Sequence, residues 1–488
     1  MNIAARNPDS VIDGVFIDNE WRPSASGETL PVIDPATGEA FSRIASGNAA
    51  DIDTAVAAAR RARNGAWGAL SATERGRILS RAAAMVTGAA GDLAALEARD
   101  TGKPISQARA DIAATARYLE FYGGAADKLH GDTIPFLPGH FVTTEYVPFG
   151  VTGHIIPWNY PAQMFGRTIA AALAMGNACV LKPAEDACLT PLRLAQILCD
   201  AGLPAGALNC VPGRGDRAGA ALAAHRGIDF ISFTGSPEVG AAVQQAAAGH
   251  HIGCTLELGG KSPQILFDDA DLDHAMPVVL KAITQNAGQT CSAGARLLVQ
   301  DGIAEAVTER LRRDFPALTA APQDADRDLG PLISPKQMQR VRRFCDRADA
   351  DGIPLIAEGR IDPQAARDGN FVAPRAYGPV PRDHPLAQQE VFGPILSLMT
   401  FSDEADAIAL ANDTDYGLVA GVWSRDGSRA IRVARQIMVG QVFVNAYGAG
   451  GGIELPFGGM KKSGHGREKG FDALYEFAAT RTMVIRHD

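Results

Sequence analysis

Residues 229–237 have the sequence Asp-Phe-Ile-Ser-Phe-Thr-Gly-Ser-Pro, and this stretch decides the fold class. Its apolar first half is typical of a buried strand. Gly235 permits a tight turn directly after the strand, and Pro237 suits the first position of a helix. The free N–H groups of such a helix would face a phosphate. A strand–Gly–helix junction that binds nothing is the alternative.

The same alternation of strand and helix extends outward from this unit. Alternating strands and helices indicate a mostly parallel sheet, and two such series indicate two α/β domains that face each other across a cleft. Before the first series, residues 51–64 and 71–101 have helical spacing, with Asp51 and Ser71 as expected N-caps. The strands of the first series are expected at 151–156, 178–181, 208–211, 229–233 and 255–258, with helices at 164–175, 191–201, 215–225 and 237–248. The strands of the second series are expected at 263–267, 296–300, 353–357, 395–401, 421–424 and 440–444.

Two polar, β-branched segments, 140–147 and 480–486, belong to neither series. A strand outside its neighbours' sheet needs a pairing partner, which is often another subunit. An ordered edge strand within the same chain is equally compatible with the sequence.

Composition limits the classes of function. The chain has 488 residues, more than one core usually serves, and its net charge of −9 gives no basic surface for nucleic acid or an anionic membrane. No apolar run is long enough to span a bilayer, and residues 1–10 contain no signal-peptide core. Seven cysteines, an odd number without metal-ligand spacing, favour a reducing compartment, so we expect a cytoplasmic protein with no metal site.

Lys182 and Glu185 follow an expected strand, at the edge where open α/β sheets bind ligands. A carboxylate at this place could accept both ribose hydroxyls of a dinucleotide and would repel a 2′-phosphate, which favours NAD over NADP. A solvated turn is the alternative. Gly213, Gly215 and Gly219 fall short of the usual glycine-rich dinucleotide fingerprint.

Cys291 is the cysteine whose small, polar surroundings, Asn-Ala-Gly-Gln-Thr-Cys-Ser, would admit a substrate and support a thiolate. Glu257 ends an apolar strand, and partial desolvation would raise its pKa toward that of a general base. Asn159, held in a loop between two prolines, has an amide that could donate to an oxyanion. Taken singly, each residue is also compatible with a purely structural role.

In this order, the motifs of the chain resemble the aldehyde dehydrogenase superfamily. The matching pieces are Pro157-Trp158-Asn159-Tyr160-Pro161, Lys182-Pro183-Ala184-Glu185, Phe233-Thr234-Gly235-Ser236, Glu257-Leu258-Gly259-Gly260-Lys261-Ser262-Pro263, Gly288-Gln289-Thr290-Cys291, Glu390-Val391-Phe392-Gly393-Pro394 and Pro456-Phe457-Gly458-Gly459.

The resemblance implies an α/β protein of three parts. A Rossmann-like NAD-binding domain would comprise residues 1–125 and 148–258, and an α/β catalytic domain residues 259–465. A small β oligomerisation domain would comprise 126–147 and 466–488, in a homodimer or homotetramer.

The resemblance also implies roles for the site residues. The Cys291 thiolate would attack the aldehyde, Asn159 would bind the oxyanion, and Glu257 would activate water to hydrolyse the thioester; a CoA-acylating enzyme would not need this base. Glu468 matches a second carboxylate to which a proton-relay role is sometimes assigned. The residues expected at the cofactor are Ile156, Pro157, Trp158, Lys182, Glu185, Gly215, Gly219, Phe233, Gly235, Ser236, Val239, Leu258, Gly259, Glu390 and Phe392.

The substrate is less constrained by the resemblance. Arg167 is typical of members that act on succinic semialdehyde, where it pairs with the substrate carboxylate, but Gln285 and Ala293 depart from that subgroup. Arg167 bonded to a protein carboxylate is the alternative, and an aromatic or aliphatic aldehyde would equally suit the aromatic side chains. The residues expected to line the substrate tunnel are Tyr160, Gln163, Met164, Arg167, Thr290, Ser292, Tyr447, Ile453 and Phe457.

Two other classes of function remain alternatives at this point. A cofactor-independent thiol esterase or hydrolase would use Cys291 but would not need Lys182, Glu185, Glu390 or Phe392. A non-catalytic scaffold would need none of the three catalytic residues.

Overall fold

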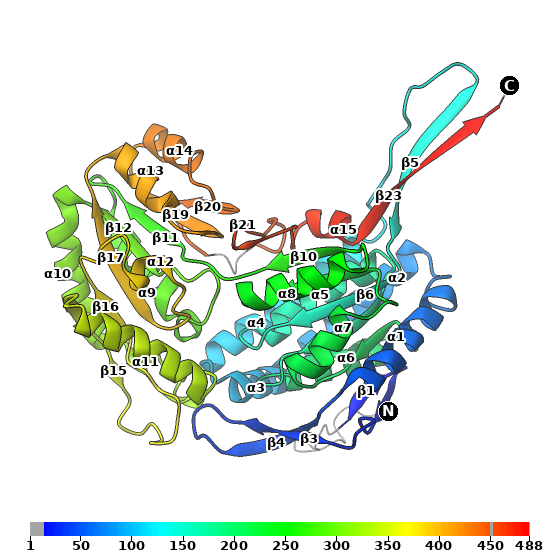
Figure 1. Cartoon of the computed structure of the whole chain (residues 1–488), viewed down its shortest axis with the longest axis horizontal. Helices are drawn as coiled ribbons and strands as arrows, with labels where there is room; N and C mark the ends of the chain where they lie inside the picture. Colours follow the sequence, from blue (N-terminus) through cyan, green and yellow to red (C-terminus); the bar gives the residue numbers. More distant parts are fainter. Residues whose placement is uncertain (1–13, 449–451, 488) are drawn as a thin grey trace.

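The computed structural model describes residues 14–448 and 452–487. Its two large sheets, each flanked by helices, lie side by side (Figure 1). The expected α/β fold class is confirmed. The segment in which the sequence indicates no signal peptide, residues 1–10, lies outside the described residues. Among the described residues, no helix is long and apolar enough to cross a membrane.

The first sheet carries the strand–turn–helix unit at residue 235. Its central strands are parallel, and β6 pairs with β7 on one side and β9 on the other. The chain moves outward from β6 through β7 and β8 and then returns to β9, so the strand order reverses between β6 and β9. Open α/β sheets bind ligands at such a reversal, outside the carboxyl ends of the strands. The order is β2 (Glu20–Arg22), β1 (Val15–Ile17), β8 (Leu208–Cys210), β7 (Ala178–Pro183), β6 (Val151–Ile156), β9 (Phe230–Thr234), β10 (Gly253–Glu257) and β22 (Gly464–His465).

Helices cover this sheet, and two sequence-based expectations about them are wrong. The helix expected at 51–64 is capped by Asn48, whose side-chain oxygen accepts from the Ala50 N–H at 2.9 Å, while Asp51 accepts from the Asn48 N–H at 3.0 Å. The helix expected at 71–101 is two helices that meet at Ala89; its Ser71 cap is confirmed. The helices are α1 (Ala49–Asn64), α2 (Ala72–Gly88), α3 (Ala90–Thr101), α4 (Ile105–Ala125), α5 (Pro161–Ala174), α6 (Leu189–Asp200), a π-helical turn (Gly215–Gly219), α7 (Ala220–Ala223) and α8 (Pro237–Ala248).

The second sheet is parallel except at one edge, where β14 runs antiparallel to β16. Its order is β14 (Leu355–Glu358), β16 (Arg375–Tyr377), β17 (Ile395–Phe401), β12 (Arg296–Gln300), β11 (Pro263–Leu266), β19 (Val419–Trp423) and β20 (Gln441–Val444). Its helices are α9 (Leu272–Thr284), α10 (Ala304–Asp314), α11 (Pro335–Ala350), α12 (Pro385–Gln388), α13 (Glu404–Asn412) and α14 (Gly427–Ala434). Shorter elements are β3 (Thr29–Ile33), β4 (Ala40–Ala45), β13 (Thr319–Ala320), β15 (Arg360–Ile361), β18 (Tyr416–Gly417), β21 (Met460–Lys461), α15 (Asp472–Glu476) and 3-10 turns at Gln285–Gly288, Asp301–Ile303, Phe315–Ala317 and Gln323–Ala325.

The two strands that fit neither series pair with each other. β5 (His140–Pro148) and β23 (Ala478–Arg486) form an antiparallel ribbon of two strands, in register from Ala478↔Pro148 to Arg486↔His140. The ribbon extends away from the body of the protein as an arm (Figure 1). Two strands more than 300 residues apart in the sequence thus form backbone hydrogen bonds with each other along one edge of each strand.

Asn177 ties the root of this arm to the first sheet, and its replacement should destabilise the protein. Its fully buried amide accepts from the Gly150 N–H at 3.0 Å and donates to the carbonyls of Ala172 and Phe477, the latter at 2.9 Å. Each buried group left without a partner costs about 1–3 kcal/mol. We expect Asn177→Ala to lower the free energy of unfolding by about 3 kcal/mol, measured by urea denaturation at one protein concentration. The control is Asn64→Ala, at an exposed helix end. Equal midpoints for the two variants would show that these buried bonds add no net stability.

Candidate active site

A cavity of about 400 Å³ lies beyond the carboxyl ends of β6 and β9, between the two sheets. It brings together residues that are far apart in the sequence. The residues expected from the sequence that line it are Pro157, Trp158, Asn159, Met164, Gly235, Ser236, Glu257, Leu258, Gly259, Cys291, Glu390 and Phe392. All three expected catalytic residues are therefore at one cavity.

Asn159 lies in the short loop between the carboxyl end of β6, at Ile156, and the start of α5, at Pro161. Its side chain is buried, and the Nδ2 amide donates to the carbonyl of Gln289 at 2.9 Å. That bond uses one N–H of the amide and leaves the other for a ligand. Gln289 lies two residues before Cys291, so this bond also connects the Asn159 loop with the loop of the candidate nucleophile.

Cys291 follows a strained turn. Asn286 and Ala287 have left-handed φ angles of 49° and 53°, which are unusual for residues other than glycine. A Cβ on Gly288 would lie 2.2 Å from the Gly393 carbonyl, so only glycine permits this packing. Burial raises the pKa of the Cys291 thiol to about 12, while the Arg167 guanidinium acts in the opposite direction. The thiol thus needs a base or a bound ligand's charge to become a nucleophile.

Glu257 is the last residue of β10, as expected, and only 2% of its surface is exposed. Among the described residues, neither carboxylate oxygen has a hydrogen-bond partner, and Arg167 Nη2 lies 3.5 Å from Oε2. Burial raises the pKa of Glu257 well above its ordinary value, and the Arg167 charge offsets part of this rise. A carboxyl group with a raised pKa and free oxygens is suited to accept a proton from water.

Arg167 forms ion pairs with protein carboxylates. Besides Glu257, its Nε pairs with Glu468, whose other oxygen accepts from the Ser232 hydroxyl at 3.2 Å. The guanidinium carbon lies 4.3 Å from the ring centre of Phe457. The structure therefore agrees with the second of the two interpretations, in which Arg167 is bonded to protein carboxylates and not to the substrate.

Glu390 and Phe392 border the cavity from the second sheet's side. Burial raises the pKa of Glu390 to about 7, and its carboxylate accepts from the Gly260 N–H at 2.9 Å. A Cβ on Gly259 would lie 2.3 Å from this carboxylate, so glycine keeps the acid against the backbone. Phe392 has a left-handed φ of 58° and packs edge-on against Trp158 at 5.4 Å.

A second group of expected cofactor residues gathers beside β7. Lys182 donates to Glu185 at 2.7 Å, and the Gly215 N–H donates to the other oxygen of Glu185 at 3.0 Å. Burial alone would raise the pKa of Glu185, but Lys182 and the Gly215 N–H hold it below its ordinary value. A Cβ on Gly219 would lie 3.9 Å from the Lys182 side chain, so the four residues are neighbours.

These features fit a dinucleotide: a paired carboxylate for one ribose, the capped N-terminus of α8 at Ser236, and a second carboxylate at Glu390. Other expected cofactor residues contribute through position. Ile156 and Phe233 lie within β6 and β9, and Val239 is 51% exposed on α8.

The expected tunnel residues surround Cys291 unevenly. Phe457 packs in one cluster with Leu418 and Val419, against which Cys291 and Tyr447 lie. The Tyr447 hydroxyl donates to the Ser292 carbonyl at 2.6 Å, and the hydroxyls of Ser292 and Thr290 are 3.3 Å apart. Gln163 instead turns away to bond a buried aspartate, Asp111. Tyr160, Met164 and Ile453 are buried.

Comparison with known proteins gives the family. The family model described as "Aldehyde dehydrogenase family" matches residues 21–483. The chain belongs to the aldehyde dehydrogenase family. It is 40% identical to mouse (Mus musculus) retinal dehydrogenase 2 over 477 residues, which cover 97% of this chain and 91% of the relative.

Solved structures of aldehyde dehydrogenases have the same fold. A structure from Burkholderia cenocepacia, named as a candidate aldehyde dehydrogenase, is 60% identical with a TM-score of 0.97, covering 97% of this chain and 100% of that one. Betaine aldehyde dehydrogenase from Staphylococcus aureus, in complex with NAD+, is 33% identical with a TM-score of 0.96, covering 100% and 97%. The expected family is confirmed, and it contradicts the alternatives of a cofactor-independent hydrolase and a non-catalytic scaffold.

Several charged residues of this aldehyde dehydrogenase line the cavity without having been predicted from the sequence. Lys336, Arg340 and Arg343 line it from α11, as does Glu238 from α8. The i, i+4, i+7 spacing of the three basic residues was a signal that they share one helix face. It did not show what that face would meet.

The ion pair between Arg167 and Glu257 predicts a pH effect. A Glu257 that acts as a general base must be ionised, so the rate of its step falls as the pH drops through the pKa of that group. Arg167 lowers this pKa; without the guanidinium the pKa rises. We expect Arg167→Met to move the acid limb of the kcat–pH profile upward by about one unit or more. Arg117→Met, half-exposed beside Glu454, is the control and should leave the profile in place. An unshifted limb in Arg167→Met would refute this coupling.

Proposed function

We propose that the protein oxidises an aldehyde that carries no carboxylate to the corresponding acid, with NAD as the oxidant. The observation that carries the proposal is the convergence of Cys291, Glu257 and Asn159 on the cavity that Glu390 and Phe392 also line. Relatives crystallised with NAD+ support the choice of cofactor. The paired Glu185 carboxylate supports NAD over NADP, because a 2′-phosphate there would meet a negative charge.

Bound NAD supplies the hydride acceptor. The chain does the rest: the Cys291 thiol loses its proton to water, the sulfur adds to the carbonyl carbon, and the Asn159 amide donates to the oxygen that becomes negative. Loss of hydride leaves the acyl group on Cys291 as a thioester. Glu257 then takes a proton from water, and the hydroxide releases the acid.

The substrate class follows from the use of Arg167. Its guanidinium is 6% exposed and lies against Glu257 and Glu468, so a substrate carboxylate would have to displace one of these acids. The side chains that crowd the nucleophile are aromatic or aliphatic, as with Phe457 and Tyr447. An aromatic or aliphatic aldehyde therefore fits better than a semialdehyde.

We also propose that the arm formed by β5 and β23 joins copies of the chain into a homodimer or homotetramer. Large apolar side chains are exposed along it, including Phe141 at 47%, Val484 at 58% and Ile485 at 49%. Exposed apolar surface of this kind is typical of an interface. The domain boundaries expected from the sequence and the cytoplasmic location stay predictions; all seven cysteines are free thiols.

Glu257→Gln tests the role of the base. We expect it to retain a burst of NADH, because acylation of Cys291 precedes the step that needs the carboxylate. Steady-state turnover should fall by about 100-fold or more. Stopped-flow absorbance separates the two phases, and Glu454→Gln, at the surface, serves as the control. Unchanged steady-state turnover would remove Glu257 from the mechanism.

A panel of aldehydes tests the substrate class. We expect kcat/KM for alkyl and benzaldehyde-type substrates to exceed that for semialdehydes of similar length by tenfold or more, because Arg167 is already paired. NADH formation measures each substrate. A preference for semialdehydes that Arg167→Met abolishes would contradict the proposal.

A further inference from the structure

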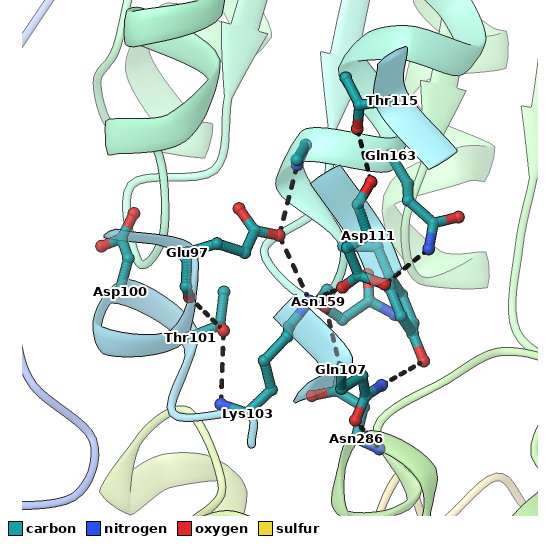
Figure 2. Close-up of polar contacts among 12 residues, drawn as sticks. Glu97, Asp100, Thr101, Lys103, Gln107, Asp111, Thr115, Asn159, Gln163 and Asn286 are labelled. Atoms are coloured by element: carbon teal, nitrogen blue, oxygen red, sulfur yellow. Dashed lines mark hydrogen bonds and ion pairs between the residues drawn. The ribbon is translucent and has the colours of Figure 1, made fainter. Parts of the chain in front are cut away.

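A buried ionic cluster adjoins the loop that carries Asn159 (Figure 2). Its centre is Lys103, whose side chain is fully buried in the turn between α3 and α4. Gly102, with a left-handed φ of 79°, ends α3 and reverses the chain, and Pro104 precedes α4. This turn directs the lysine inward instead of toward solvent.

All three protons of the Lys103 ammonium have an acceptor. They go to Glu97 Oε1 at 3.3 Å, to Asp111 Oδ2, and to the backbone carbonyl of Asn159 at 3.0 Å. Burial by itself would lower the pKa of Lys103, but the two carboxylates outweigh it and hold the pKa above its ordinary value. The lysine is therefore charged, and part of that charge is applied to the Asn159 backbone.

The carboxylates of Glu97 and Asp111 also bind residues at the start of α5. Asp111 Oδ1 accepts from Gln163 Nε2 at 2.7 Å, and Glu97 Oε1 accepts from the Ala162 N–H at 3.4 Å. Figure 2 shows both residues at the cluster, Gln163 from the first turn of α5 and Asn159 from the loop before that helix. The cluster thus holds the backbone on both sides of Pro161.

A second contact connects the cluster with the loop of the nucleophile. Asn286 Nδ2 donates to the same Asn159 carbonyl at 2.9 Å. The Asn159 and Asn286 amides both approach the Gln289 carbonyl, at 2.9 and 3.3 Å. The direction of the Asn159 side chain is thereby set from its own backbone and from the segment that leads to Cys291.

The energetic argument favours positioning over stability. Removing three ionisable groups from water costs several kcal/mol each, which their attraction barely offsets, and apolar residues often stabilise such a place as well. In contrast, displacing an oxyanion donor by about 1 Å can slow the reaction about a hundredfold. A charged anchor with three directional bonds fixes a backbone carbonyl more closely than apolar packing does.

We propose that Lys103 is a positioning residue for the reaction: held by Glu97 and Asp111, it fixes the Asn159 carbonyl and so aims the Asn159 amide at the oxygen bound beside Cys291. This inference rests on the proposed oxyanion role of Asn159. Lys103 touches neither substrate nor cofactor in this scheme and acts through Asn159.

A double-mutant cycle on the full-length enzyme tests this inference. Lys103→Met combined with Asp111→Asn removes one charge of each sign, so the net charge of the buried cluster does not change. The rate of the NADH burst is measured for this pair, for Asn159→Ala and for the triple variant, with NAD affinity and the thermal midpoint. Asp100→Asn, equally buried on α3 but bonded to the Leu189 N–H, is the control.

We expect Asn159→Ala to slow the burst by about 100-fold or more and the Lys103 pair to slow it by about 10- to 100-fold. The triple variant should be no slower than Asn159→Ala, because Lys103 acts only through that amide. NAD affinity should stay within twofold in every variant, and Asp100→Asn should keep the full burst rate.

Three results would overturn the inference. If the double variant of Lys103 and Asp111 folds and keeps the wild-type burst rate, Lys103 has no positioning role, and the role of Asn159 is unaffected. Losses that multiply in the triple variant assign Lys103 a general structural effect. If Asn159→Ala keeps the wild-type burst rate, Asn159 does not bind the oxyanion, and Lys103 cannot act through it. If the pair does not fold, Lys103→Gln takes its place under the same criteria.

Discussion

β6 pairs in parallel with β7 on one side and β9 on the other, and the active site depends on this pairing. Parallel strands end at the same edge of a sheet, so the loops that carry Asn159 and Ser236 leave next to each other. After β6 the chain continues through β7 and β8 before it returns to β9. No direct connection from β6 to β9 therefore crosses the space between the two loops. The second sheet then closes that space with Cys291 and Glu390.

Within this frame, the site is built from charges that the protein removes from water and pairs with one another. Arg167 lies between Glu257 and Glu468, Lys103 between two further acids, and Glu390 against a backbone N–H. Such groups respond strongly to their neighbours, because a low dielectric environment magnifies each interaction. The guanidinium of Arg167, which a substrate carboxylate beside Cys291 would need, is already used in the ion pairs with Glu257 and Glu468.

Local signals in the sequence were sufficient for much of the fold. The strands 151–156, 296–300 and 395–401 were predicted with their observed bounds, because each is an apolar run between turn residues. The break at Ala89 and the cap at Asn48 were missed, since several nearby polar residues can cap a helix and only the folded geometry selects one. Residue types and spacing also pointed to Cys291, Glu257 and Asn159, although each alone was ambiguous.

The sequence by itself determined the alternation of strands and helices, the family and the identity of the candidate nucleophile, base and oxyanion donor. These depend on short segments whose chemistry is local. The tertiary structure alone decided that Arg167 pairs with two protein acids, that Lys103 reaches the Asn159 carbonyl, and that β5 pairs with β23. Those contacts join residues that are 56 to 346 positions apart. No local pattern specifies them, because the partner of a charge or a strand edge is fixed only when the whole chain has packed.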